Sequence, residues 1–208
     1  MDWIKYTLFT LGGTPVLLMD LISSVLGLTC VFLAGRNSKY NFWVGYLYTA
    51  ALFFLFWNKN LYAMLFLQPI SLTINIIGHW RWTHPSKEEE SSKGDLKVTQ
   101  LSWTQRGLGV MMVLLLSALW GWMLFKLFPG DPHPYLDTVV TVLILYAQLL
   151  SALKKWDCWL VWLLVNITQI ILHISVGNVF MPIVCTLYLI NGIWSLFGWR
   201  KLYNKENK

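Results

Sequence analysis

Seven apolar runs long enough to cross a membrane constrain this chain more than any other feature. About 20 helical residues span the roughly 30 Å of bilayer hydrocarbon. Only 12% of the 208 residues are charged, whereas a soluble domain carries about 25%. The sequence therefore predicts an all-α membrane protein with seven transmembrane helices. The predicted spans cover residues 15–34, 42–57, 61–82, 107–128, 135–153, 158–176 and 179–199.

An internal repeat organises these spans. A shift of 120 positions places Gly198 on Gly78 and Asn178 on Asn58, and it overlays the last three spans on the first three. Two triplets joined by a single span must point the same way, which predicts a 3+1+3 parallel repeat, typical of transporters. The predicted parts are a short interfacial N-terminal segment (1–14), the first three-helix repeat (15–82), a cytoplasmic loop (83–106), a linker helix (107–128), the second three-helix repeat (135–199) and a cytoplasmic tail (200–208).

The basic residues predict the orientation of the chain. Thirteen of the sixteen Lys and Arg residues fall on one side of the seven spans, and only Lys5, Lys59 and Lys126 fall on the other. The positive-inside rule then places the N-terminus outside and the C-terminus in the cytoplasm. The thirteen are Arg36, Lys39, Arg81, Lys87, Lys93, Lys97, Arg106, Lys154, Lys155, Arg200, Lys201, Lys205 and Lys208.

Polar residues at helical spacing mark four of the spans. Polar side chains inside a bilayer are costly, so a shared face predicts a cavity, although single amides also serve only to bridge helices. The four sets are Trp162, Asn166, Gln169 and His173; Tyr188, Asn191 and Ser195; Gln68, Ser71 and Asn75; and Thr141 with Gln148. We interpret His173 as interfacial, because it lies near the outer end of its span.

The remaining tryptophans lie at the ends of the spans, where they are typical of an aromatic belt at the membrane surface. Trp3 and Tyr6 would anchor the N-terminal segment in the same way. The tryptophans assigned to the belt are Trp3, Trp57, Trp80, Trp82, Trp156 and Trp199.

The predicted cavity contains amides, hydroxyls and aromatic rings with almost no charge. Such a site suits a neutral or weakly cationic ligand with hydroxyls and a flat ring, because amides bind hydroxyls and aromatic faces attract positive charge. A phosphate would need Arg or Lys at the midplane. The spans contain no HExxH motif, no Cys/His ligand pair and no paired carboxylates. We therefore predict no enzyme activity, no cofactor, no metal site and no nucleic-acid partner, and we interpret the three cysteines as apolar residues.

Two segments resemble the PnuC family of bacterial vitamin transporters. The segment LYAMLFLQPISLTINIIGHWRW contains Gln68, Asn75, Gly78 and Trp82 in the order typical of that family. The segment beginning at Trp162 is similar to the family's Trp-x-x-x-Asn helix, with Asn166 at its fourth following position. It precedes a last span that bears Tyr188 and Asn191. The resemblance covers nearly the whole chain from about residue 20.

The resemblance implies facilitated diffusion of nicotinamide riboside, a pyridinium ribonucleoside, across the bacterial inner (plasma) membrane. In the family, cytosolic phosphorylation traps the substrate for NAD biosynthesis. Members form homo-oligomers such as trimers. The alternatives are thiamine, another vitamin or nucleoside, or a small sugar on the same scaffold, and a membrane scaffold without a substrate. The predicted substrate-binding residues are Gln68, Asn75, Gln148, Trp162, Asn166, Gln169, Tyr188 and Asn191.

The spans also predict passive transport. Ion coupling needs a buried titratable or oxygen-rich site, and the second to seventh spans have no Asp or Glu between their ends. Asp20 and His173 lie near the outer ends of their spans, and there is no Walker A pattern for ATP coupling. We therefore expect a uniporter.

Overall fold

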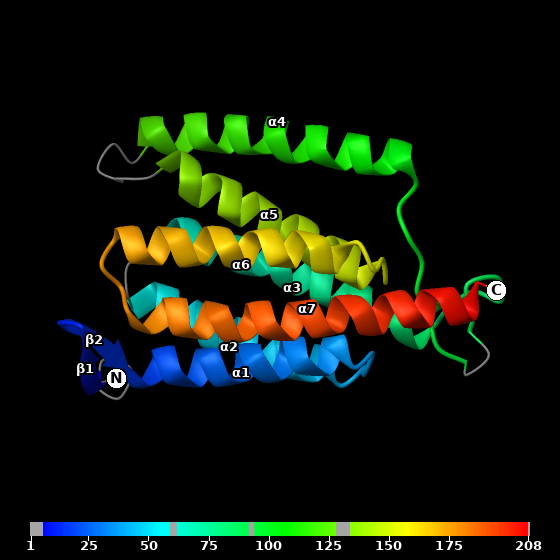
Figure 1. Cartoon of the computed structure of the whole chain (residues 1–208). Helices are drawn as coiled ribbons and strands as arrows, with labels where there is room; N and C mark the ends of the chain where they lie inside the picture. Colours follow the sequence, from blue (N-terminus) through cyan, green and yellow to red (C-terminus); the bar gives the residue numbers. More distant parts are fainter. Residues whose placement is uncertain (1–5, 59–61, 92–93, 128–133, 208) are drawn as a thin grey trace.

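The computed structural model describes residues 6–58, 62–91, 94–127 and 134–207, and these ranges contain seven helices and one short hairpin (Figure 1). Successive helices run in opposite directions between the two ends of a single bundle. The N-terminal hairpin lies at one end and the C-terminus at the other (Figure 1). The elements are β1 (Thr7–Leu11), β2 (Thr14–Leu17), α1 (Leu18–Gly35), α2 (Asn41–Asn58), α3 (Tyr62–Thr83), α4 (Trp103–Leu127), α5 (Pro134–Ala152), α6 (Cys158–Ser175) and α7 (Phe180–Glu206).

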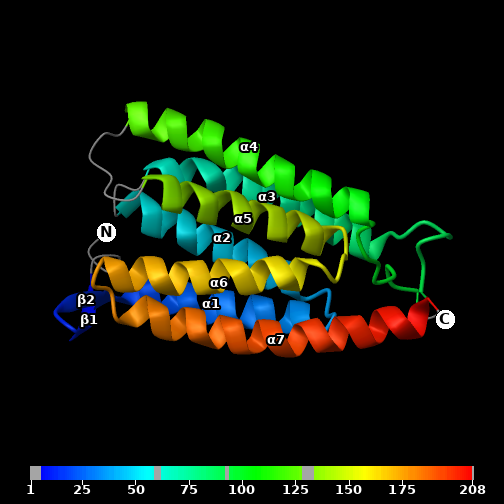
Figure 2. The same ribbon diagram turned by 45° about the horizontal axis from the view of Figure 1, so that its top comes forward.

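Six of the helices form a closed ring. Helix α1 packs on α2, α2 on α3, α3 on α5, α5 on α6, α6 on α7, and α7 returns to α1. Helix α4 lies outside this ring and packs on α5 (Figures 1 and 2). Four helices are long and apolar enough to cross a membrane, and α2 and α5 contribute shorter apolar stretches. The chain is thus a multi-pass helical membrane protein whose ring can enclose a site.

A β-hairpin precedes the first helix. Strands β1 and β2 pair antiparallel, with Leu11 opposite Thr14, and the two-residue turn between them is Gly12-Gly13. Both glycines have positive φ, 57° and 81°, as a tight hairpin turn requires and as glycine adopts without strain. Helix α1 therefore begins at Leu18, three residues after the predicted start of the first span. The predicted anchor Trp3 lies outside the described residues, as do Lys5, Lys59, Lys93 and Lys208.

Two helices extend beyond their predicted spans. Helix α4 begins at Trp103 because Ser102 and Gln105 form a reciprocal cap, in which each backbone N–H donates to the other's side-chain oxygen at 3.0 and 3.2 Å. This S-x-x-Q pattern is a recognised start signal. Helix α7 continues to Glu206, past the predicted end at Trp199.

The belt prediction is wrong for three of the tryptophans. Trp57 and Trp80 are exposed, at 62% and 64%, but Trp82, Trp156 and Trp199 are buried. Trp199 packs on Trp82 and Trp159, with ring centroids 5.7 and 5.6 Å apart. These rings form a buried cluster with Phe42 at the C-terminal end of the ring, and α2, α3, α6 and α7 each contribute an aromatic residue to it.

Residues 94–102, which we call the closing segment, cover this aromatic cluster. The predicted loop 83–106 is polar in composition, yet Leu96 and Val98 are 3% and 0% exposed. The backbone N–H of Val98 donates to Glu206 Oε2 at 2.9 Å, and that of Leu101 donates to Asp157 Oδ2 at 2.8 Å. The buried Lys154 ammonium donates to the Leu96 carbonyl. The segment is therefore packed into the C-terminal end of the ring as part of its core.

Candidate binding cavity

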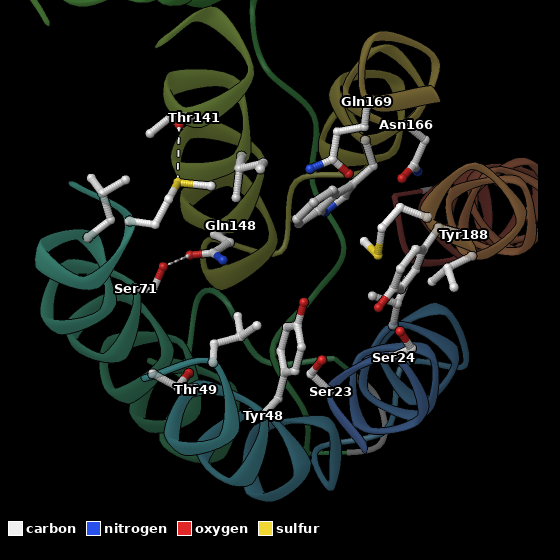
Figure 3. Close-up of a pocket in the computed structure, with 18 of the residues that line it drawn as sticks. Ser23, Ser24, Tyr48, Thr49, Ser71, Thr141, Gln148, Asn166, Gln169 and Tyr188 are labelled. Atoms are coloured by element: carbon white, nitrogen blue, oxygen red, sulfur yellow. Dashed lines mark hydrogen bonds between the residues drawn. The ribbon is translucent and has the colours of Figure 1, made fainter. Parts of the chain in front are cut away.

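A central cavity of about 270 Å³ lies inside the ring and is lined by residues of all six of its helices. The labelled polar side chains project from the surrounding helices into one shared space (Figure 3). The polar and aromatic residues that line it are Asp20, Ser23, Ser24, Tyr48, Thr49, Phe56, Gln68, Ser71, Thr141, Gln148, Trp159, Trp162, Asn166, Gln169, His173 and Tyr188.

Helix α6 supplies one polar face of the cavity. Trp162, Asn166, Gln169 and His173 all line it, as their spacing of four, three and four residues on a helix requires. The Gln169 Oε1 atom accepts a weak hydrogen bond from Cys185 Sγ at 3.5 Å. Asn166 is only 5% exposed, and among the described residues its amide has no hydrogen-bond partner. Its amide is therefore available to a ligand in the cavity.

Helices α3 and α5 form a wall of satisfied polar groups. The Gln68 Nε2 atom donates to the Met64 carbonyl at 3.0 Å. Ser71 Oγ donates to Gln148 Oε1 at 3.0 Å and so joins the two helices (Figure 3). Because Gln148 is a primary amide, its Nε2 donor is distinct from the oxygen that Ser71 occupies. This wall therefore presents oriented amide groups to the cavity.

Helices α1 and α2 contribute residues that the polar stripes did not reveal, and these lie beside Tyr188 of α7, which the stripes did predict. Ser23 and Ser24 donate to the Asp20 carbonyl at 3.1 and 2.6 Å. Tyr48 and Tyr188 approach α1 at Gly27, where an added Cβ would overlap the Tyr188 hydroxyl and lie 3.1 Å from Tyr48 Cζ. The signal in the sequence is the Ser-Ser-x-x-Gly pattern, because small residues permit close helix packing.

Two of the eight predicted site residues do not line the central cavity, whereas the other six do. Asn75 lines a second cavity of about 120 Å³ and donates to the Phe42 carbonyl at 3.3 Å. Asn191 faces α1, where its Nδ2 atom would lie 3.8 Å from a Cβ at Gly35. That Nδ2 is buried without a partner among the described residues. The six are Gln68, Gln148, Trp162, Asn166, Gln169 and Tyr188.

Two titratable side chains lie at the hairpin end of the cavity. His173 lies in the last turn of α6 and lines the cavity, a role that its interpretation as an interfacial residue did not include. Asp20 also lines the cavity, and its Oδ2 accepts the Leu17 N–H at 3.1 Å. No Lys or Arg of the described ranges lines it. The cavity can therefore hydrogen-bond hydroxyls and stack a flat ring, but it offers no fixed cation to a phosphate.

Comparison with known proteins matches residues 17–201 to the family described as nicotinamide mononucleotide transporter. The nicotinamide riboside transporter PnuC of Haemophilus influenzae is 26% identical over 93% of this chain and 84% of its own length. The riboflavin/roseoflavin transporter RibM of Streptomyces davaonensis is 25% identical over 96% of this chain and 92% of its own. A crystal structure of the vitamin B3 transporter PnuC is 22% identical, covers 90% of this chain and 83% of its own, and superposes with a TM-score of 0.73.

Proposed function

The chain belongs to the nicotinamide mononucleotide transporter family, and from this premise we propose that its central cavity carries nicotinamide riboside across the membrane. Relatives named for nicotinamide riboside transport match most of this chain. The riboside is a flat cationic ring joined to a hydroxylated sugar. These are the two chemical features that the cavity residues complement.

One observation carries the choice of the riboside over the mononucleotide. The cavity is lined by amides, hydroxyls and aromatic rings, and no Lys or Arg of the described residues reaches it. A phosphate in such a site would lose its water without gaining a cationic partner, and this desolvation is expensive. The phosphate-free substrate is therefore the better fit, although the family is named for the mononucleotide.

Each of the six lining residues takes a role from its chemistry. We assign Trp162 to stack on the pyridinium ring, whose positive charge the indole face attracts. Asn166, Gln169 and Gln148 supply amide groups to the ribose hydroxyls and the carboxamide. Gln68 and Tyr188 complete the polar wall. The unpartnered amide of Asn166 gives it the largest expected contribution among the amides.

The membrane arrangement follows from the charge distribution. We propose that the C-terminus and the loop 83–106 lie in the cytoplasm, that α1–α3 and α5–α7 form a parallel repeat, and that α4 links them. The ring supports this repeat, because α1 and α5, the first helices of the two triplets, both begin at the hairpin end. Helix α1 contacts α7 and α5 contacts α3, so the first helix of each triplet packs on the last helix of the other (Figure 1). We further propose passive transport with cytosolic phosphorylation as the trap, and assembly as a homo-oligomer.

Riboflavin is the second candidate, since the relative RibM is named for it. Binding cavities for small molecules commonly measure about 300–1,000 Å³, and this cavity of about 270 Å³ lies just below that range. A nucleoside whose base is a single ring suits this volume better than a flavin, whose ring system has three fused rings.

Calorimetric titration of the purified protein tests the proposal. Nicotinamide riboside should bind at least tenfold more tightly than its mononucleotide, thiamine or riboflavin. Trp162→Ala should lose most of that affinity and Trp162→Phe should keep much of it, because phenyl also stacks. Tightest binding of the mononucleotide or of riboflavin would overturn the substrate assignment. Equal affinities of the two variants would overturn the role of Trp162.

A further inference from the structure

The second cavity lies directly beside the central one, toward the C-terminal end of the ring. Tyr48, Gln148, Trp159 and Trp162 line both cavities. The second cavity also touches residues at the helix ends that meet there. These are Ala34, Asn41, Phe42, Trp82 and Ala152. The two cavities together therefore run from the hairpin end to the aromatic cluster beneath the closing segment.

The polar side chains follow the same course as the cavities. On α3 the stripe passes from Gln68 in the central cavity, through Ser71, which lines both, to Asn75 in the second. Cavities that stay empty in proteins are typically lined by apolar side chains. A cavity lined by polar side chains indicates an occupant that forms hydrogen bonds with them. The stripe of α3 is thus longer than the central cavity requires.

Most polar groups around the second cavity are satisfied within the protein. Asn75 donates to the Phe42 carbonyl at 3.3 Å, and Trp82 Nε1 donates to the Ser151 carbonyl at 3.2 Å. Trp159 differs: it is 1% exposed, and its Nε1 has no hydrogen-bond partner among the described residues. Because the Nε1 atom itself is buried, it is the rest of the indole ring that lines the second cavity.

We infer that the second cavity is a transit site, through which the substrate passes on its way from the central cavity to the C-terminal end. This inference rests on the proposed function. It gives Asn75 a role in passage, since its side chain lines this second site and not the central one. The ligand class is that of the central cavity, a neutral or cationic nucleoside without phosphate.

Two variants fill the second cavity without touching the central one. Gly45 and Cys30 line only the second cavity. A Cβ added at Gly45 would lie 2.8 Å from Asn75 Nδ2, so Gly45→Ala narrows the passage. Cys30→Leu adds volume from the neighbouring helix, α1, and gives an independent variant should Gly45→Ala fail to fold. Gln68→Leu, in the central cavity only, is the matched control.

The experiment measures equilibrium affinity and the rate of radiolabelled nicotinamide riboside entry into proteoliposomes for the same proteins. Both filling variants should keep their Kd within threefold and lose at least tenfold in rate, whereas Gln68→Leu should raise Kd. Unchanged rates in both filling variants would identify a water-filled void and overturn the inference. A rise in Kd that matches the loss of rate would also overturn the inference, because it would show that the two cavities form one binding site. Failure of the proposed function is separate, because the wild-type protein would then not bind the riboside.

Discussion

The two ends of the helical ring are built differently. At the hairpin end, the central cavity is lined by Asp20 and His173, and the chain outside it is a short two-stranded hairpin. At the C-terminal end, a buried aromatic cluster lies beneath the closing segment. There, Lys154 and Asp157 are only 1% and 4% exposed.

This difference shows where closure of the ring depends on specific polar contacts. Buried charges are tolerated only when they are paired and hydrogen-bonded. The Lys154 ammonium donates a hydrogen bond to the Leu96 carbonyl. It also lies over the Trp82 ring, with its Nζ 4.6 Å from the ring centroid. The Asp157 carboxylate accepts hydrogen bonds from the Arg106 side chain and from the Leu101 N–H. The proposed passage of a substrate through this end would require these contacts to rearrange. We therefore expect variants at this end to change stability and variants in the central cavity to change affinity.

The largest effect is expected at an ion pair of the C-terminal end, between Arg106, whose side chain is 27% exposed, and the buried Asp157, whose side chain is 5% exposed. Arg106 Nε and Nη2 each lie 2.8 Å from Asp157 Oδ1. Arg106→Leu leaves the Asp157 carboxylate buried without its cation and should cost about 3–5 kcal/mol of stability. The control is Arg81→Leu, which breaks the Arg81–Glu89 pair, whose side chains are 35% and 47% exposed. Such an exposed pair contributes about 0–1 kcal/mol. Thermal unfolding in detergent measures both, and equal losses would contradict the comparison.

A smaller effect is expected in the central cavity. Asn166→Ala removes the unpartnered amide and should weaken nicotinamide riboside binding by about 1–3 kcal/mol, the cost of leaving a ligand hydroxyl unpaired. Asn191→Ala is the matched control, because Asn191 packs against α1 outside the central cavity. Its Kd should stay at the wild-type value. An equal loss in both variants, measured by calorimetry, would show that helix packing and not ligand contact sets the affinity.

The contrast between Asn166 and Asn191 also marks what the sequence can predict. Helix length and a shared polar face are local properties with a period of 3.6 residues, so the seven helices and the stripe of α6 are readable from spacing alone. Which neighbouring helix or cavity a polar stripe faces depends on the packing of distant segments and is not a local property of the sequence. Asn75 lies seven residues beyond Gln68, about 10 Å along the helix axis, and that distance carries it from the central cavity into the second.

The C-terminal end shows the same limit. Leu96 and Val98 are two apolar residues in a polar stretch, and nothing near them in the sequence predicts burial. Their burial depends on Glu206, more than one hundred residues away, which accepts the Val98 N–H. The tryptophans at the helix ends illustrate this too: Trp80 is exposed and Trp82 is buried, because two residues on a helix point about 200° apart. The hairpin was not predicted, because residues 1–14 were interpreted as an interfacial segment, although Gly12-Gly13 is a recognised turn signal.

A pH-dependent effect of intermediate size is expected from Lys154, which lies in the connection between α5 and α6. Burial lowers the pKa of its ammonium from 10.5 to about 8, although Asp95 and Glu206 act in the opposite direction. Between about pH 8 and 10.5 the unfolded chain therefore binds more protons than the folded one, so this residue makes stability rise with pH. The rise should be on the order of 2 kcal/mol, since one pKa unit corresponds to about 1.4 kcal/mol.

The thermal midpoint in detergent, followed from pH 7.5 to 10, measures this effect. Lys154→Met keeps an unbranched side chain over Trp82 and should abolish the rise that this residue contributes. Lys201→Met, at an exposed position near the C-terminus, should retain it. A rise that persists in Lys154→Met would assign the pH dependence to another group and would weaken the contrast between the two ends.

No effect at all is expected from an imposed ion gradient. Among the described residues, the Asp, Glu and His side chains that line the central cavity are Asp20 and His173, and both lie at the hairpin end. Proton coupling requires a titratable group that senses both the substrate and the side to which the site is open. Neither residue lies at the level of Asn166, two helical turns deeper on α6. Labelled nicotinamide riboside should therefore equilibrate across proteoliposomes and no further.

The test imposes a proton or a sodium gradient on proteoliposomes that contain the wild-type protein, Asp20→Asn or His173→Gln. Asp20→Asn keeps an oxygen to accept the Leu17 N–H, so it removes the charge while preserving the cap on α1. All three proteins should reach the same internal concentration, equal to that outside, with or without the gradient. Accumulation above the outside level by the wild-type protein, abolished in one variant, would identify that residue as a coupling site. The hairpin end would then drive transport and not only admit the substrate.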